Sequence, residues 1–122
     1  MAGSLEMIRS VADFAALQAA GRSRSHPLLV LRYRRNEIER TRYGISTGRR
    51  VGNAVTRNRV RRRLCEILRR QQVRVPAGWD ILLVCRPAAA TASQAELASA
   101  LERTLAKAGL SGDTGDRAGT GS

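Results

Sequence analysis

The sequence predicts an α/β fold, in which one sheet of three to four strands packs against helices as an α+β sandwich. Two segments of apolar residues repeat with the period of a helix, and one of them carries most of the positive charge. Short aliphatic runs bounded by proline, glycine or polar clusters lie around these segments, which is typical of strands. The expected order is helix, two or three strands, basic helix, strand, helix. A length of 122 residues allows one domain around a core of modest size.

The N-terminal part predicts a short helix followed by a strand. Residues 1–8 are expected to form a flexible arm before a domain that spans 9–109. Ser10 followed by Asp13 resembles a capping box, and Gly21 is expected to end the helix in the left-handed conformation. The apolar run that follows places three large side chains on one face of a strand, and these are Leu29, Leu31 and Tyr33.

The next residues predict a hairpin. The polar segment 34–40 is expected to form its loop, and 41–46 is expected to return as the second strand. Gly48 and Gly52 interrupt the loop that leads onward, which predicts an irregular connection before the basic helix.

A long basic helix is predicted for residues 53–70. Its apolar residues recur at the spacing of a helix face that docks on a core, and they are Val60, Leu64, Ile67 and Leu68. Residues 49–70 hold nine arginines and one glutamate, so this stretch carries +8 of the formal net charge of +12. Charge concentrated in this way destabilises a compact fold by self-repulsion, which indicates a polyanionic partner. Arginine dominates over lysine, which suits bidentate contacts with phosphate.

The C-terminal part predicts a buried strand and a last helix. Residues 79–85 are almost continuously apolar, as expected for a strand that is covered on both faces. Ser93 followed by Glu96 matches a second capping box, and Gly109 is expected to end the helix. The apolar face of this helix is formed by Leu97, Leu101 and Leu105. Residues 110–122 are expected to form a disordered tail, because almost all of them are small or polar.

The titratable residues predict no catalytic or metal site within the protein itself. His26 is the single histidine, and it lacks the companions that a metal ion or a nucleophile needs. Cys65 and Cys85 have no CxxC spacing and are expected to be reduced thiols in a cytoplasmic protein. No apolar run approaches the ~18–20 residues of a membrane span. The sequence contains no helix-turn-helix pattern that would indicate DNA binding. It also has few aromatic residues, so binding of single strands mainly by base stacking is not expected.

An ordered motif within the basic stretch narrows the class of partner. Residues 44–64 read Gly-Ile-Ser-Thr-Gly-Arg-Arg-Val-Gly-Asn-Ala-Val-Thr-Arg-Asn-Arg-Val-Arg-Arg-Arg-Leu. This segment resembles the arginine-asparagine-arginine signature of the bacterial ribonuclease P protein subunit. Flanking segments resemble the same family, so the likeness covers about residues 8–108. These segments are Asp13-Phe14, Gly21-Arg22, 27–31, 76–87 and Glu96-Leu97.

The resemblance implies a fold and a function. It implies a left-handed crossover from the strand at 41–46 through the basic helix to the strand at 79–85, where physical principles alone would favour a right-handed one. The family's holoenzyme is one small protein with a large catalytic RNA, which removes the 5′ leader from precursor tRNA by metal-assisted phosphodiester hydrolysis. Because the RNA holds the magnesium ions, the protein is expected to contain no catalytic residue and to bind no cofactor alone.

The resemblance also implies two sets of site residues. The motif helix and its loop would bind the catalytic RNA, and a cleft between the first helix and the sheet would hold the single-stranded leader of precursor tRNA. The predicted RNA-binding residues are Arg49, Arg50, Asn53, Arg57, Asn58, Arg59, Arg61, Arg62 and Arg63. The predicted leader-binding residues are Phe14, Gln18 and Arg32.

Four positions depart from the family pattern, and one of them is Gly48, where a basic residue or serine is more usual. Gln18 stands where a second aromatic residue is common, and Arg32 replaces a cleft aromatic on the first long strand, with Tyr33 on the other face. Leader recognition is therefore expected to use polar and cationic contacts more, and stacking less. Cys65 stands where a further arginine is common, and its thiol gives no phosphate contact.

A second interpretation stays open at this point. A structural RNA-binding module, such as a ribosome-associated protein with no part in tRNA processing, would have the same composition. Cleavage of precursor tRNA at low magnesium, by this protein combined with a bacterial catalytic RNA, would distinguish the two functions.

Overall fold

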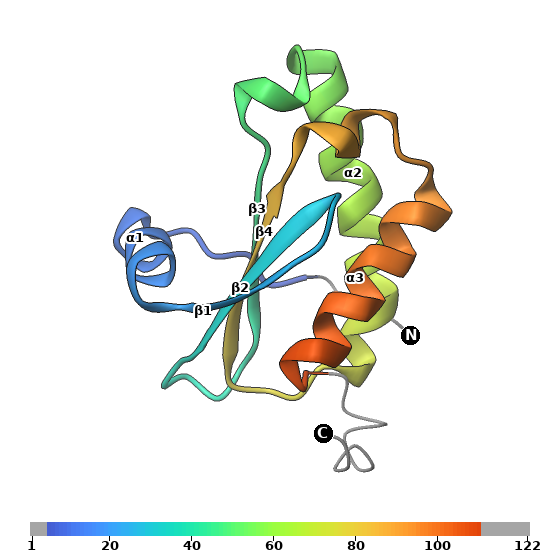
Figure 1. Cartoon of the computed structure of the whole chain (residues 1–122). Helices are drawn as coiled ribbons and strands as arrows, with labels where there is room; N and C mark the ends of the chain where they lie inside the picture. Colours follow the sequence, from blue (N-terminus) through green and yellow to red (C-terminus); the bar gives the residue numbers. More distant parts are fainter. Residues whose placement is uncertain (1–4, 111–122) are drawn as a thin grey trace.

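The computed structural model of the chain describes residues 5–110, which form three α-helices and one four-stranded sheet (Figure 1). The α-helices are α1 (Val11–Ala20), α2 (Ala54–Gln71) and α3 (Gln94–Ala108). The strands are β1 (Arg22–Ser25), β2 (Leu29–Arg35), β3 (Arg42–Ser46) and β4 (Trp79–Cys85). Three short 3-10 helices are η1 (Arg49–Val51), η2 (Gln72–Arg74) and η3 (Pro87–Thr91). The predicted fold class and element order are confirmed. The outer parts of the predicted arm and tail, 1–4 and 111–122, lie outside the described residues.

The sheet is mixed and has the strand order β1-β2-β4-β3. β1 pairs antiparallel with β2, β2 pairs antiparallel with β4, and β4 pairs parallel with β3. The interior position of β4 agrees with its almost continuous apolar sequence. Because β3 and β4 are parallel neighbours, the chain must cross over between them, and α2 lies in that crossover. The left-handed sense of the crossover stays a prediction from the family resemblance.

The predicted hairpin between the second and third strands is wrong. β2 and β3 are not neighbours, since β4 lies between them. The segment after β2 is instead held against the start of β4, where the backbone N–H of Asn36 donates to the carbonyl of Gly78 at 2.9 Å. The physical reason is burial: β4 covers both of its apolar faces only inside the sheet, and a β2–β3 hairpin would leave it at an edge.

β1 is a strand that the sequence analysis allowed for but did not locate. All four of its residues are exposed, so it has no apolar alternation to detect. It forms one edge of the sheet, with Arg22 opposite Tyr33 and Arg24 opposite Leu31. Cross-strand partners point to the same face of a sheet, so these two arginines share a face with two core residues of β2.

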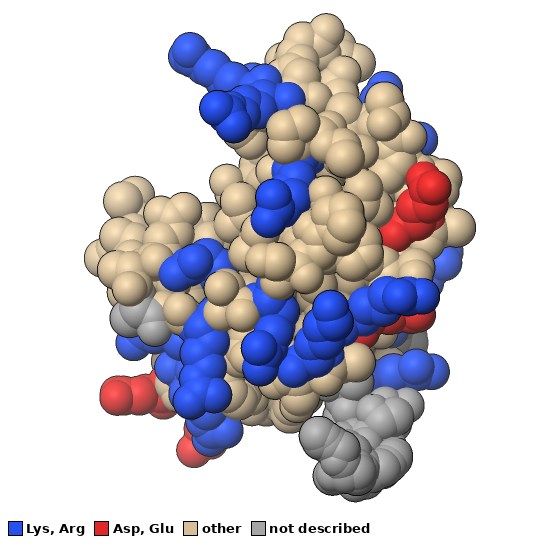
Figure 2. Space-filling model, in the orientation of Figure 1, with Lys and Arg blue, Asp and Glu red and all other residues tan. Residues whose placement is uncertain are grey.

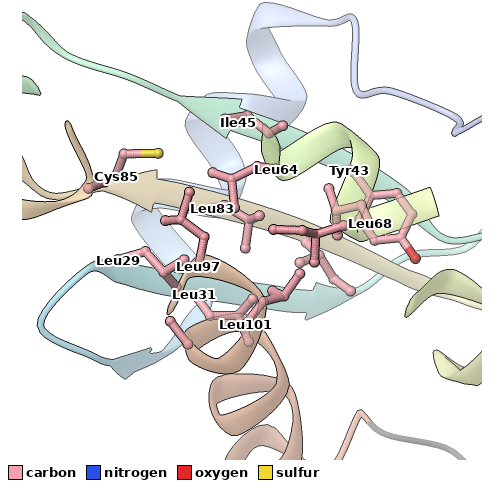
Figure 3. Close-up of a cluster of buried hydrophobic side chains, with 14 of the residues drawn as sticks. Leu29, Leu31, Tyr43, Ile45, Leu64, Leu68, Leu83, Cys85, Leu97 and Leu101 are labelled. Atoms are coloured by element: carbon pink, nitrogen blue, oxygen red, sulfur yellow. The ribbon is translucent and has the colours of Figure 1, made fainter. Parts of the chain in front are cut away.

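Hydrophobic layers cover both faces of the sheet. The larger layer lies between the sheet and the helices α2 and α3, and Figure 3 shows leucines of both helices meeting the strands there. The predicted apolar stripes are confirmed, because every one of their residues is buried: Val60, Leu64, Ile67, Leu68, Leu97, Leu101 and Leu105. The smaller layer lies under α1, on the other side of the sheet in Figure 1, where Leu17 packs with Ile8 and Leu82.

The predicted capping residues Ser10 and Ser93 begin their helices as expected, but the Asp13 side chain binds Arg42 and does not complete a capping box with Ser10. Side chains of Ser10, Asn53 and Ser93 cap the N-termini of α1, α2 and α3. Glu96 completes a capping box with Ser93, and Gly109 ends α3 in the left-handed region with a φ of 77°. Gly21 ends α1 in an extended conformation with a φ of −75°, because the chain continues directly into β1. The left-handed conformation predicted for Gly21 is therefore wrong.

Residues next to both described ends pack on the domain. The N–H of Ile8 donates to the carbonyl of Tyr43 at 2.8 Å, and the N–H of Tyr43 donates to the carbonyl of Glu6 at 2.9 Å. The end of the predicted arm thus lies alongside β3. Leu110, the first residue of the predicted tail, is buried, and its N–H donates to the carbonyl of Leu105 at 2.8 Å.

Candidate RNA-binding surfaces

The turn before α2 places two exposed arginines, Arg49 and Arg50, at one end of the molecule. Gly52 allows this turn, because its φ of 149° is one that other residues rarely adopt. Asn53 then caps α2, and its Oδ1 atom accepts the N–H of Thr56 at 2.9 Å. Asn53 was predicted to contact RNA, and the structure gives its side-chain oxygen a role in starting the helix.

Two predicted RNA-binding arginines tie α2 to the segment after β4. Arg59 donates to the carbonyl of Ala90 at 3.0 Å, and Arg63 donates to the carbonyl of Ala92 at 2.8 Å. Both guanidinium groups are partly buried. These bonds hold η3 against the helix, so the two arginines have a structural role that the sequence pattern did not indicate.

Two further arginines of the motif are partly buried. Arg61 donates to Oγ1 of Thr47, a buried residue of the loop after β3, at 3.0 Å. Arg57 has a buried Nε atom without a hydrogen-bond partner within residues 5–110. Arg59, Arg61 and Arg63 are called the anchoring arginines below, because each bonds to another part of the fold.

The remaining residues of the motif face solvent. Arg62 and Asn58 are exposed on α2, and Arg49 and Arg50 are exposed on η1. None of these three arginines has a hydrogen bond or ion pair within the described part of the chain. Arg49, Arg50 and Arg62 are called the outward arginines below.

Phe14 lies on the α1 side of the sheet, where it was predicted to line a cleft. Its ring is partly buried and packs on the small hydrophobic layer of Ile8, Leu17 and Leu82. The ring also lies directly over the backbone of Gly44 in β3, a position without a side chain. The exposed part of the ring faces solvent, so it is accessible to a stacking partner.

Gln18 and Arg32 lie close to each other on the same side of the sheet. The Arg32 guanidinium donates to the carbonyl oxygens of Leu17, Gln18 and Gly21. These carbonyls lie at the C-terminal end of α1, where a cation is favourable. Arg32 therefore holds α1 against β2, whereas the Gln18 side chain is exposed.

An ion-pair network beneath α1 was missed by the sequence analysis. Arg42 binds both carboxylate oxygens of Asp80, with its Nε 3.0 Å from Oδ1 and its Nη2 2.8 Å from Oδ2, and it reaches Asp13 of α1 at 3.2 Å. Burial opposes ionisation of Asp80, but bonds from Arg42 and Asn36 outweigh it and lower the pKa of the carboxyl. The network joins α1, β3 and β4. The direct pairing of Arg42 opposite Asp80 in the parallel β3–β4 register creates it, and this register could not be predicted from the sequence.

Basic side chains gather in two regions of the surface in Figure 2. One group projects near η1 and the beginning of α2, and a second group crosses the lower front over β1, β2 and the later part of α3. Arg49 and Arg50 belong to η1, and Arg62 lies further along α2.

The other titratable residues do not gather into a site. Residues 5–110 contain no group of three or more His, Cys, Asp or Glu side chains that could hold a metal ion. The Nδ1 atom of His26 accepts the N–H of Leu28 at 3.1 Å, which is a role in the turn between β1 and β2. Cys65 and Cys85 are unpaired, and burial raises the pKa of Cys85 to about 11. No helix in the described residues is long and apolar enough to span a bilayer.

Comparison with known proteins decides the family. The family model described as Ribonuclease P matches residues 4–109. The ribonuclease P protein component of Gluconacetobacter diazotrophicus is 37% identical over 114 residues, covering 92% of this chain and 98% of the relative. That of Herpetosiphon aurantiacus is 35% identical over 105 residues, covering 86% of this chain and 85% of the relative. The chain belongs to the ribonuclease P protein family.

Solved structures of ribonuclease P proteins have the same fold. The protein of Staphylococcus aureus superposes with a TM-score of 0.81 at 28% identity, covering 88% of this chain and 99% of that one. The protein of Thermotoga maritima gives a TM-score of 0.73 at 27% identity, covering 80% and 93%. The predicted function is thereby confirmed: the chain is the protein subunit of ribonuclease P, the ribonucleoprotein endoribonuclease that processes the 5′ leader of tRNA. These matches decide against the ribosome-associated alternative.

Proposed function

We propose that this ribonuclease P protein binds the catalytic RNA through the N-terminal part of α2 and holds the leader of precursor tRNA on the α1 side of the sheet. The observation that carries the proposal is the division of the motif arginines into two sets. The anchoring arginines fix α2 against η3 and the loop after β3. The outward arginines stay exposed and unpaired, and they are the groups that meet RNA phosphates.

The anchoring arginines also support this surface electrostatically. A guanidinium has five N–H donors, and each anchoring arginine uses one nitrogen on the protein. Their charge therefore adds to the potential around the outward set while their position is fixed. Asn58 and Arg57 lie in the first half of the same helix and complete the proposed RNA-binding surface.

On the α1 side, a base of the leader stacks on the exposed part of Phe14. Gln18 lies one helical turn later and is exposed, so it supplies a polar contact to the same strand. Arg32 is committed to the carbonyls at the end of α1 and holds Gln18 in place. This assignment gives Arg32 a supporting role in leader binding.

The protein contributes binding and positioning, and the catalytic RNA contributes the reaction. Magnesium ions held by the RNA supply the chemistry of phosphodiester hydrolysis. The described residues offer no cluster of side chains that would hold such an ion on the protein. The two unpaired cysteines support a location in the reducing cytoplasm.

Reconstitution with a bacterial catalytic RNA tests this function. The protein is expected to restore cleavage of precursor tRNA at a low magnesium concentration chosen so that the RNA alone gives no cleavage. A variant with Arg50→Ala and Arg62→Ala is expected to require more protein for the same rate. Absence of stimulation by the wild-type protein would contradict the proposal. Leader cleavage by RNA-free protein that survives nuclease treatment and repurification would contradict the assignment of catalysis to the RNA.

A further inference from the structure

The edge of the sheet at β1 carries exposed cations that lie outside the motif. Arg22 and Arg24 stand opposite Tyr33 and Leu31 of β2, which are buried against α2 and α3. Because cross-strand partners share a face, Arg22 and Arg24 lie on the α3 side of the sheet. They are two residues apart on one strand, which separates them by about 7 Å. All of β1 is exposed, so both side chains are open to solvent.

α3 adds two more cations beside this edge. Arg103 and Lys107 are four residues apart, so they lie on the same side of the helix about 6 Å apart along its axis. Both are exposed. Both cations lie near His26, which is in the turn that follows β1. The pKa of His26 is lowered, mainly by burial and then by the positive charges of Arg103 and Lys107. The four residues are called the β1–α3 basic surface, and they are Arg22, Arg24, Arg103 and Lys107.

The cations of this surface are not ion-paired with the acids near them. In residues 5–110, none of its four members forms a hydrogen bond or an ion pair. The acids of α3 have other partners: Glu102 accepts from the side-chain amide of Gln71 in α2 at 3.0 Å, and Glu96 accepts from the N–H of Ser93 at 2.8 Å. The two acids of α3 equal its two cations in number, and Arg22 and Arg24 of β1 give this edge an excess of positive charge.

Two hollows adjoin the β1–α3 basic surface. One of about 520 Å³ is lined by His26, Arg103, the acid Glu96 and residues of η3. The other, of about 280 Å³, is lined by Arg22 and Trp79, with the Arg35 guanidinium 5.3 Å from the centre of the Trp79 ring. Figure 2 shows basic side chains as a row over β1, β2 and α3. The surface therefore combines a line of cations with recesses at its ends, one of which holds a partly exposed aromatic ring.

We propose that the β1–α3 basic surface binds phosphates of a second segment of the catalytic RNA. Unpaired cations on one face repel each other in the free protein, and a polyanion relieves this repulsion. The surface is also continuous with the motif through η3. Arg59 and Arg63 of α2 bond to the region of η3, and residues of η3 line the hollow that contains Arg103. An RNA that contacts the beginning of α2 thus reaches the β1–α3 surface around η3. The inference rests on the proposed function, because its partner is the same RNA.

Binding of the catalytic RNA without tRNA tests this inference. Two double variants each remove two charges: Arg22→Gln with Arg24→Gln, and Arg103→Gln with Lys107→Gln. A matched control, Arg9→Gln with Arg69→Gln, removes two exposed charges that belong neither to the surface nor to its two hollows. All replaced side chains are exposed, and thermal melts verify that each variant folds. Each test variant is expected to bind more weakly than the control. The slope of log K against log salt is expected to fall by up to ~1.8, since each lost duplex phosphate contact contributes about 0.9.

The outcomes separate this inference from the proposed function. If both test variants match the control while Arg50→Gln with Arg62→Gln weakens binding, the β1–α3 surface is a solvated face and the inference is overturned alone. If the test variants bind the catalytic RNA like the control but their holoenzymes lose affinity for leaderless tRNA, the surface contacts tRNA and the inference is again overturned. If the test variants weaken binding and the Arg50 and Arg62 variant does not, the proposed role of α2 fails while the β1–α3 surface stands.

Discussion

The ring of Phe14 fills the place where a side chain of Gly44 would begin. A Cβ atom at position 44 would lie 2.8 Å from Cζ of Phe14 and 3.2 Å from Cδ1 of Leu82. Phe14 belongs to α1 and Gly44 to β3, so this contact sets how closely the helix approaches the sheet. Gly44 has no positive φ, so close packing, rather than an unusual backbone conformation, explains this glycine at the start of the motif.

Replacement of Gly44 by alanine is expected to displace Phe14. Overpacking of this kind costs about 1–3 kcal/mol of the free energy of unfolding. It should also weaken binding of leader-bearing tRNA, because the stacking ring moves. Gly48→Ala is the matched control, since a Cβ at Gly48 meets nothing within 4 Å. Urea denaturation of both variants checks the prediction, and equal stability of the two would contradict it.

The two sets of motif arginines are expected to differ in their effect on stability. Arg59→Ala and Arg63→Ala each remove a bond to the η3 region, which should lower the free energy of unfolding by about 1 kcal/mol. Arg62→Ala removes an exposed, unpaired charge, so stability should stay unchanged while the affinity for catalytic RNA falls. Urea denaturation and RNA titration of the three variants measure both quantities. A loss of stability in Arg62→Ala equal to that in Arg59→Ala would remove the distinction.

The ion pair between Arg42 and Asp80 is expected to contribute strongly to stability. The Asp80 side chain is 7% exposed and that of Arg42 is 18% exposed, so Asp80→Asn leaves a largely buried cation with a weaker partner. Breaking a buried pair in this way costs about 3 kcal/mol. Glu6→Gln breaks the exposed pair with Arg40 and should change stability little. Thermal denaturation of both variants at neutral pH tests the prediction. Equal melting temperatures of the two variants would contradict it.

The same pair predicts how stability depends on pH. The folded state lowers the pKa of Asp80 below its ordinary value of 3.8. The contribution is therefore complete above that value and is lost as the pH falls from it toward the lower pKa of the folded state. Between neutral pH and acid, wild-type protein should lose more stability than Asp80→Asn. Parallel pH profiles of unfolding free energy for the two proteins would show that Asp80 does not supply this dependence.

Anions are expected to stabilise the protein in the absence of RNA. A formal charge of +12 on one small domain favours binding of sulfate or phosphate to the native state, which raises stability by mass action. The thermal midpoint in low-salt buffer should rise on addition of sulfate at constant ionic strength. Identical midpoints with sulfate and with chloride would contradict specific anion binding.

The elements with the strongest local signals could be predicted from the sequence. The stripe through Val60 and Leu64 and the capping pair of Ser93 and Glu96 are local features, and they fixed the bounds of α2 and α3 to within a residue or two. The hairpin prediction failed because strand neighbours depend on the whole sheet: β3 follows β2 in the chain, yet β4 lies between them. β1 left no pattern to find, because it is fully exposed.

The sequence predicted which residues belong to the candidate site better than it predicted what each of them contacts. The motif predicted which arginines belong to the site. It could not predict that Arg59 donates to the carbonyl of Ala90, because the two residues are 31 positions apart in the sequence. Arg32 was predicted to face the leader because it replaces an aromatic residue, and its bonds to the end of α1 appear only when helix and strand are in place. The β1–α3 basic surface was hidden for the same reason, since β1 and α3 are distant in the chain.

The central claim is that α1 holds the leader while α2 holds the catalytic RNA. Holoenzymes made with Phe14 variants test it, by their affinities for leader-bearing and leaderless tRNA. Phe14→Ala is expected to leave assembly with the catalytic RNA intact and to weaken binding of precursor tRNA by about 1–3 kcal/mol, the contribution of one stacked base. Affinity for mature tRNA should stay unchanged, and Phe14→Tyr, which keeps the ring, should bind both tRNAs like wild type. If Phe14→Ala remains folded and weakens both tRNAs equally, the leader does not bind at Phe14 and the account is contradicted.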